Sequence, residues 1–124
     1  MLPSLIQIKG DYYKSNFDAS FDSFNIFVDG SSTDTHSGIV VCIFHGPATK
    51  ENMIFESSMS LSPLFDAPAA EIEAFSYGVS LIKQLPLYAS VQIITDCSTI
   101  LTQLESTKIC SQILLDTYRV IRSL

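Results

Sequence analysis

Three stretches rich in β-branched and aromatic residues follow one another with short connections, and this pattern restricts the fold more than any other. They cover residues 24–28, 38–44 and 53–61. Turn-forming sequences, Asp29-Gly30-Ser31-Ser32 and His45-Gly46-Pro47, come after the first two stretches. Strands joined by short connections usually pair with their neighbours in sequence, so we expect an antiparallel three-stranded meander.

The pattern becomes helical in the second half of the chain. Residues 69–84 carry apolar side chains at helical spacing, and Pro86 ends that element. Residues 91–95 are an apolar run typical of a buried strand, whereas residues 98–105 and 109–124 again have helical patterns. The predicted order is therefore β-β-β-α-β-α-α. This order indicates an α/β fold in which packed helices cover a mixed sheet, made of the meander and at least one parallel strand.

Length and composition are those of one globular domain. The chain has 124 residues, of which 47% are apolar and 16% charged. We expect residues 1–22 to form a lead-in segment with at most one short strand, and residues 23–124 to form the domain. No apolar run reaches the roughly 18 residues that cross a bilayer, and the first residues lack a secretory signal. A cytoplasmic or nuclear protein, neither secreted nor membrane-bound, is therefore expected.

Three acidic residues lie where this fold would bring them together. Asp29 ends the first predicted strand, Asp96 ends the fourth, and Glu71 lies in the first turn of the long predicted helix. Binding sites in α/β proteins form beyond the carboxyl ends of the strands. A fourth strand paired with the first would therefore place Asp29 and Asp96 side by side.

Helical geometry selects Glu71 rather than Glu73 for this site. Glu71 shares a face with small and apolar residues, which should pack on the sheet and carry the carboxylate inward. Glu73 lies about 200° further round the helix axis and should point to solvent. The residues that share the face of Glu71 are Ala74, Phe75, Gly78 and Ile82.

Three converging carboxylates favour a site for a divalent metal ion. Close carboxylates on a core-facing surface are costly unless a cation neutralises them, and no Lys or Arg lies near these three in sequence. Hard divalent cations bind carboxylate oxygens, and a pair of them can activate water for phosphodiester hydrolysis. Each acid alone also has a structural explanation: a turn at Asp29, a helix N-cap at Asp96, and a favourable first-turn charge at Glu71.

The acids lie within three stretches of recognisable sequence: Ile26-Phe27-Val28-Asp29-Gly30-Ser31 followed by Gly38-Ile39-Val40-Val41, then Ala70-Glu71-Ile72-Glu73-Ala74, then Ile93-Ile94-Thr95-Asp96-Cys97-Ser98. These stretches resemble the type 1 ribonuclease H family, and most closely the ribonuclease H domains of non-LTR retrotransposon polyproteins. Their order and spacing also fit, and the resemblance covers roughly residues 24–124.

The resemblance implies an endonuclease that cuts the RNA strand of an RNA–DNA hybrid with two Mg²⁺ or Mn²⁺ ions. Asp29 would bridge both ions, and Glu71 and Asp96 would complete the binding of one of them. Backbone groups around Gly30 and Ser31 would lie near the RNA, whose 2′-hydroxyls distinguish it from DNA. The implied partners are the hybrid and the rest of a polyprotein, or a partner chain, that completes the fold.

The C-terminal end departs from the family pattern. Family members continue with a fifth strand, a loop with a mobile histidine, and a helix with a fourth metal-binding aspartate, so we expect a domain truncated at Leu124. Asp116, the only acid after Glu105, is expected to be an exposed helix residue, and His36 and His45 to be ordinary loop residues. Without a fifth strand, we expect the fourth strand to have an unpaired edge and the isolated chain to be modestly stable.

Charge and cysteine content leave alternative functions open. Thirteen acidic against seven basic residues, a net charge of −6, argue against a general polyanion-binding surface, although bound Mg²⁺ would offset part of this charge. Cys42, Cys97 and Cys110 lack zinc-binding spacing and are expected to be free thiols. One alternative is a catalytically impaired ribonuclease H-like domain retained for protein interaction or scaffolding. Another is a metal-dependent phosphotransfer enzyme of the same fold, such as an integrase or resolvase relative.

Overall fold

The computed structural model describes all residues except 1–5, 10–22, 87–89, 106–111 and 124. Five strands, three α-helices and two short 3-10 helices (η) are found among the described residues. In chain order they are β1 Ile6–Lys9, β2 Ser23–Ser32, β3 Ser37–His45, η1 Lys50–Asn52, β4 Met53–Leu61, α1 Ala67–Ser80, η2 Leu81–Gln84, β5 Ser90–Ile94, α2 Ser98–Glu105 and α3 Gln112–Ser123.

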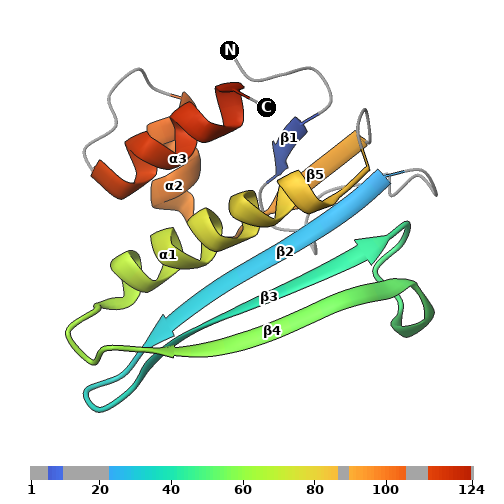
Figure 1. Ribbon diagram of the computed structural model, residues 1–124. Coiled ribbons are helices and arrows are strands. Elements are labelled where there is room, and N and C mark those ends of the chain that lie inside the picture. The colour runs from blue at the N-terminus through green and yellow to red at the C-terminus, as the bar shows by residue number, and fades with distance from the viewer. Residues whose placement is uncertain (1–5, 10–22, 87–89, 106–111, 124) are drawn as a thin grey trace.

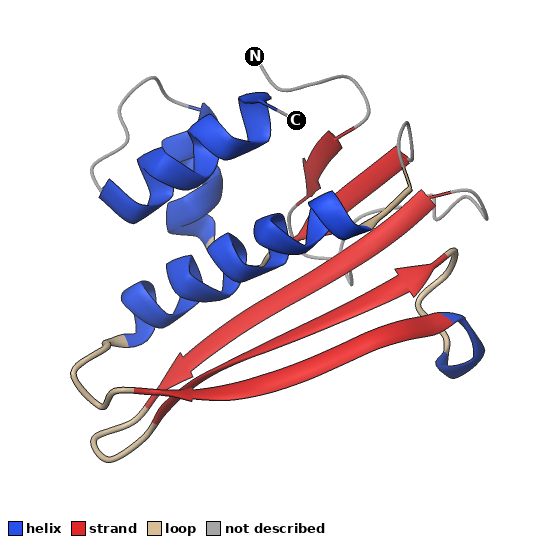
Figure 2. Ribbon diagram, viewed as in Figure 1, coloured by secondary structure: helices blue, strands red, loops and turns tan. Residues whose placement is uncertain are grey.

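One mixed sheet organises the fold, with its strands in the order β1-β5-β2-β3-β4. β2, β3 and β4 form the predicted antiparallel meander, whereas β5 lies parallel to both β1 and β2. Figure 1 and Figure 2 show α1 running along β2, and α3 packs on α1. The predicted α/β fold with a mixed sheet is confirmed.

The core lies between this sheet and the helices. Apolar side chains from β2, β3 and β5 meet those of all three α-helices in one buried cluster. Burial of such side chains is the main favourable contribution to folding. The largest fully buried apolar residues are Phe75, Ile26, Ile93, Ile100, Leu114 and Ile121. None of the described helices combines the length and the apolar character needed to cross a membrane.

β2 continues through Asp29-Gly30-Ser31-Ser32, a sequence that predicts a turn. Its pairing with β3 extends as far as Ser32, opposite Ser37. The aspartate and the glycine therefore lie inside the strand, and the chain reverses over residues 33–36 instead. The predicted turn, and with it the end of the strand at the aspartate, is wrong. The second predicted turn is present, and Gly46 adopts a φ of 98° there, which favours glycine.

β1 covers the edge of β5 that we expected to be unpaired. It pairs in parallel with β5 from Ile6 opposite Val91 to Lys9 opposite Ile94, and β2 pairs with the other side of β5. The expectation of an open edge on this strand is wrong, because a segment from the N-terminal side of the chain occupies that position. Because β5 has no open edge on this side, the reason for expecting an only modestly stable chain no longer holds.

The helices lie close to their predicted positions. α1 begins at Ala67, earlier than predicted, because the Asp66 side chain caps it by accepting a hydrogen bond of 2.9 Å from the Ala69 amide. The predicted continuous helix to Gln84 is divided into α1 and η2 at Ser80. α2 matches its predicted range. The described Cys42 and Cys97 are free and partly buried, as predicted, whereas Cys110 lies outside the described residues.

A glycine allows α1 to pack tightly on β2. A Cβ atom at Gly78 of α1 would lie 2.5 Å from Cγ1 of Val28 and 3.3 Å from Cγ2 of Ile26. Both side chains are buried in the core and have little room to move aside. The helix therefore needs a residue without a side chain at this position.

We predict that Gly78→Ala destabilises the protein by about 1–2 kcal/mol, because overpacking outweighs the gain of about 1 kcal/mol in helix propensity. Urea unfolding followed by circular dichroism measures this change. Ser76→Ala, on the same helix but only partly buried, is the control and should change the free energy of unfolding by no more than about 0.5 kcal/mol. Equal or higher stability of Gly78→Ala would contradict the close packing.

Candidate functional site

The structure brings together the three acids selected from the sequence. Asp29 lies in β2, Glu71 in α1, and Asp96 follows β5 after one residue. One side-chain oxygen from each lies within 4.8 Å of those of the other two. Asp29 and Asp96 are exposed, whereas Glu71 is partly buried. The cluster thus forms where two adjacent parallel strands meet the N-terminal half of a helix.

Gly30 allows α1 to approach β2 closely enough for this arrangement. A Cβ atom at this position would lie 2.3 Å from the carbonyl carbon and oxygen of Ala70 and 2.5 Å from the amide nitrogen of Glu71. The Gly30 amide also donates a hydrogen bond of 2.8 Å to Oε1 of Glu71. The backbone of β2 therefore holds the glutamate in place beside Asp29.

Two details of the helix differ from expectation. Glu71 lies beyond the first turn of α1, because the helix begins earlier than predicted. Its position depends on Gly30 rather than on the positive end of the helix dipole, which acts mainly within the first turn. Glu73 lies outside the acidic cluster, but its side chain is partly buried rather than fully exposed.

The electrostatics of Glu71 suit a bound cation. Burial first, and then the neighbouring carboxyl groups of Asp29 and Asp96, raise the pKa of Glu71 to about 7 from its ordinary value of 4.5, although the Gly30 amide acts in the opposite direction. Oε2 of Glu71 is buried and has no hydrogen-bond partner. A divalent cation bound by oxygen ligands would satisfy this atom and neutralise the three acids, so the residues fit such an ion.

Thr95 and Ser32 support the site, and sequence reasoning missed both. The Thr95 side chain is 1% exposed, and its Oγ1 accepts a hydrogen bond of 3.1 Å from the Cys97 amide. This bond spans Asp96 and shapes the segment that carries it. The Ser32 hydroxyl donates a 2.8 Å bond to the Phe65 carbonyl, which ties the end of β2 to the loop before α1. A sequence pattern can predict that a residue is buried, but it does not predict which backbone group the hydroxyl of Thr95 or Ser32 will bond.

Gly30 and Ser31, expected near a substrate, have different surroundings. The Gly30 amide is already engaged with Glu71. Ser31 is exposed, and its carbonyl accepts a 3.3 Å bond from the Ser37 hydroxyl. The Ser31 side chain is therefore open to solvent within two residues of Asp29.

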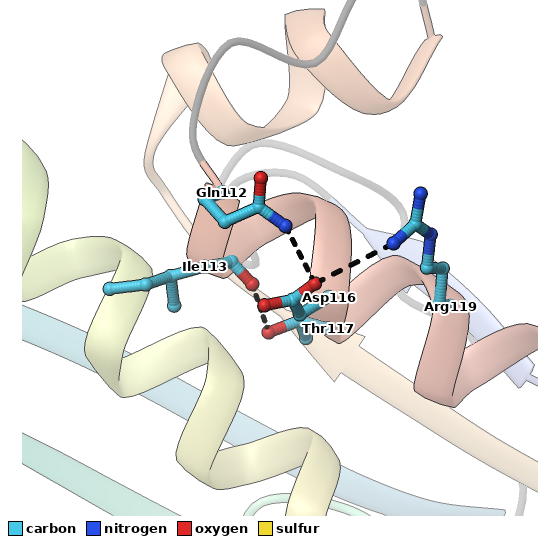
Figure 3. A network of polar contacts seen from close by, with 5 residues as sticks. All are labelled: Gln112, Ile113, Asp116, Thr117 and Arg119. Carbon is cyan, nitrogen blue, oxygen red and sulfur yellow. Dashed lines mark hydrogen bonds and ion pairs between the residues drawn. The ribbon is translucent and has the colours of Figure 1, made fainter.

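Asp116 lies in α3, outside the acidic cluster found among the described residues. Figure 3 shows its carboxylate accepting a 2.9 Å hydrogen bond from Gln112, and Arg119 lies 3.8 Å away as an ion pair. The side chain is 60% exposed, so the prediction of an exposed helix acid is confirmed. His36 and His45 are also exposed. His36 lies in a loop as predicted, whereas the prediction for His45 is wrong, because His45 is the last residue of β3 and its ring stacks on that of Phe24 at 4.3 Å.

We predict that the metal-free protein loses stability as the pH rises from about 4.5 to about 7. Folding raises the pKa of Glu71, so with rising pH the carboxyl group loses its proton in the unfolded chain before it does so in the folded protein. The resulting loss of folding stability is complete above the pKa of the folded state. Glu71→Gln should remove this loss, whereas Glu73→Gln should not. Urea unfolding at a series of pH values, with chelator present, measures the difference between the variants. Parallel pH profiles for wild type and Glu71→Gln would contradict the prediction.

We also predict that Thr95→Val destabilises the protein by about 1–2 kcal/mol, because it leaves the Cys97 amide without its acceptor. Thr95→Val should also weaken the affinity for Mn²⁺, because Asp96 is no longer held in position. Thr95→Ser retains the hydroxyl and should keep the wild-type affinity. Urea unfolding and calorimetric titration with Mn²⁺ measure the two effects. Identical Mn²⁺ affinities for Thr95→Val and wild type would show that the hydroxyl does not position Asp96.

The fold, but not the sequence, finds counterparts among known proteins. No family model and no curated protein matches the chain. LC11-RNase H1, solved in complex with an RNA/DNA hybrid, has a TM-score of 0.61 and 20% identity over 77% of this chain and 71% of that chain. The N-terminal RNase H domain of rv2228c from Mycobacterium tuberculosis has a TM-score of 0.61 and 19% identity over 82% and 72%. RNase H1 from the archaeon Halobacterium salinarum has a TM-score of 0.57 and 13% identity over 82% and 75%. These similarities establish that the chain has a ribonuclease H-like fold.

Proposed function

We propose that this protein is a metal-dependent endonuclease that hydrolyses the RNA strand of RNA–DNA hybrids. One observation carries the proposal: Glu71, whose Oε2 is buried without a hydrogen-bond partner, clusters with the carboxylates of Asp29 and Asp96. Such a group is costly in a fold that needs only stability, whereas a cation site requires it. The ribonuclease H-like fold supports the reaction class.

Asp29, Glu71 and Asp96 are the residues proposed to hold Mg²⁺ or Mn²⁺, with two ions expected from the family resemblance. Ions bound there would supply an activated water and stabilise the leaving oxygen of the scissile phosphodiester. The chain itself orients the ligands. The Gly30 amide donates a hydrogen bond to Oε1 of Glu71, and the Thr95 hydroxyl shapes the segment that carries Asp96. Oε2 of Glu71 thus remains for the cation.

The proposed substrate is an RNA–DNA hybrid that passes over the exposed acids near Gly30 and Ser31. Support comes from the fold neighbour LC11-RNase H1, which was solved with an RNA/DNA hybrid. The net charge of −6 opposes long-range attraction to nucleic acid, so affinity should depend on the bound metal. The motifs around the acids support an origin in a retrotransposon polyprotein, whose other parts or a partner chain would assist binding. We place the protein in the cytoplasm or the nucleus.

A second candidate is a catalytically impaired domain of the same fold that mediates protein interaction or scaffolding. It is favoured by the small number of acids, because the described cluster contains three carboxylates and Asp116 lies elsewhere on α3. Three ligands can hold one cation well but leave a second one poorly bound. Absence of hydrolysis by the wild-type protein, with or without metal binding, would identify this alternative.

We predict that the purified chain cleaves the RNA strand of a labelled RNA–DNA hybrid when Mg²⁺ or Mn²⁺ is present. Asp29→Asn and Asp96→Asn should each reduce the rate by more than the roughly 10–100-fold typical of residues that only support a metal ligand. Denaturing gels resolve the products, and single-stranded RNA and duplex DNA test the choice of substrate.

Asp116→Asn is the matched control, because it removes an equivalent charge from the exposed face of α3, and it should retain the wild-type rate. Chelator should abolish cleavage in all variants. Wild-type protein that binds Mn²⁺ in calorimetry but leaves the hybrid intact would support the impaired domain. Protein that neither binds metal nor cleaves would overturn the nuclease proposal and would support the impaired domain, whose interaction role needs no metal.

A further inference from the structure

Most of the exposed large apolar side chains of the described residues lie on or beside β4, the last strand of the sheet. Of the six large apolar residues that are exposed among the described ones, five belong to β4, to the loop after it, or to the neighbouring strand β3. An edge strand that carries exposed apolar residues is a template for pairing with another chain. The five are Met53, Ile54, Met59, Leu64 and Val40, and the sixth, Ile113, lies in α3.

β4 is also an edge strand with little protection against further pairing. It pairs with β3 on one side and lies at the end of the sheet (Figure 1). Edge strands usually carry Lys, Pro or several charges that prevent association, but Glu56 is the only charged residue in β4, and the strand contains no proline. A bulge, which also hinders pairing at an edge, is confined to the start of the strand near Ile54, since Ile43 pairs with Phe55 and Phe44 with Met53. From Phe55 onward the strand is regular.

We propose that β4 pairs antiparallel with β4 of a second copy of this chain, about a two-fold axis at Ser57. This register places Phe55 of each copy opposite Met59 of the other, and Glu56 opposite Ser58. Aromatic rings and methionine sulfur make favourable contacts, and no like charges stand directly opposite each other. The pattern of β4 is therefore complementary to itself.

Neighbouring registers are less favourable. An axis at Glu56 would place two glutamates directly opposite each other, which destabilises a strand pair. An axis at Ser58 would place Phe55 opposite Leu61 but would leave the exposed Met59 opposite Ser57. The axis at Ser57 thus combines the apolar pair with separated charges.

The pairing would also continue the existing core. Phe55 is partly buried and packs against the core cluster, and its register partner in β3 is the buried Ile43. Met59 lies opposite the buried Ile39 but is itself 43% exposed. Pairing would cover Met59 and join the two five-stranded sheets into one continuous sheet.

Sedimentation velocity over a concentration range up to about 0.3 mM tests this dimer. Each copy carries a net charge of −6, so the experiment is performed at about 0.15 M salt or more, where the Debye length is about 8 Å or less. Met59→Lys should raise the dissociation constant at least tenfold. Ile113→Lys is the matched control, because Ile113 is 42% exposed against 43% for Met59, and it should leave the constant unchanged. A monomeric wild type, or a dimer that only Ile113→Lys weakens, would overturn the proposal.

Cysteine cross-linking tests the register. Directly opposed residues of antiparallel strands have Cβ atoms about 4.5–5.5 Å apart, so Ser57→Cys should form an intermolecular disulfide under mild oxidation. Ser60→Cys in the same strand would face Ile54 and should remain at the wild-type background, which the native cysteines set. Equal cross-linking of the two variants on non-reducing gels would exclude the axis at Ser57. The outcome does not depend on whether the protein is a nuclease.

Discussion

The contact between the backbones of β2 and α1 at Gly30 determines the rest of the candidate site. Hypothetical Cβ distances of 2.3 Å to Ala70 and 2.5 Å to the Glu71 nitrogen leave no space for any side chain. Gly78 provides a second close approach, against Val28 of the same strand. A helix held by its backbone at two points cannot shift as a flexible side chain can. The position of Glu71 is therefore set by the fold itself.

That position is unfavourable for a carboxylate unless a cation binds there. Gly30 satisfies Oε1, while Oε2 is buried without a partner and two further acids lie nearby. Burial and the neighbouring acids consequently raise the pKa of Glu71 to about 7. A protein that needed only stability would gain by replacing the glutamate with an uncharged residue, since unpaired buried charge is costly. A divalent cation reverses this balance, because it is attracted most strongly where the acids repel one another most.

Local patterns predicted much of this fold, and the errors have a common cause. β-rich apolar runs predict the meander and β5, helical spacing predicts α1 and α2, and helical phase selects Glu71. The sequence predicts a turn at Gly30 because a glycine can serve either for its conformational freedom or for its lack of a Cβ atom, and the residue type does not distinguish the two. Only the packing of α1 shows which property is used. The pairing of β1 was missed for a related reason: four residues near the start of the chain pair with β5, which lies far along it.

The different places of β5 and β4 in the sheet make the proposed metal site compatible with the proposed interaction surface. β5, which leads to Asp96, is paired in parallel on both sides, so a change of register would cost two sets of hydrogen bonds and turn its side chains to the opposite faces. β4 is separated from β2 by β3. Its core-facing positions include the half-exposed Met59, and a new neighbour there would leave the pairing of β2 and β5 unchanged. Pairing on both sides thus fixes the strand that leads to Asp96, whereas β4 has one partner strand among the described residues.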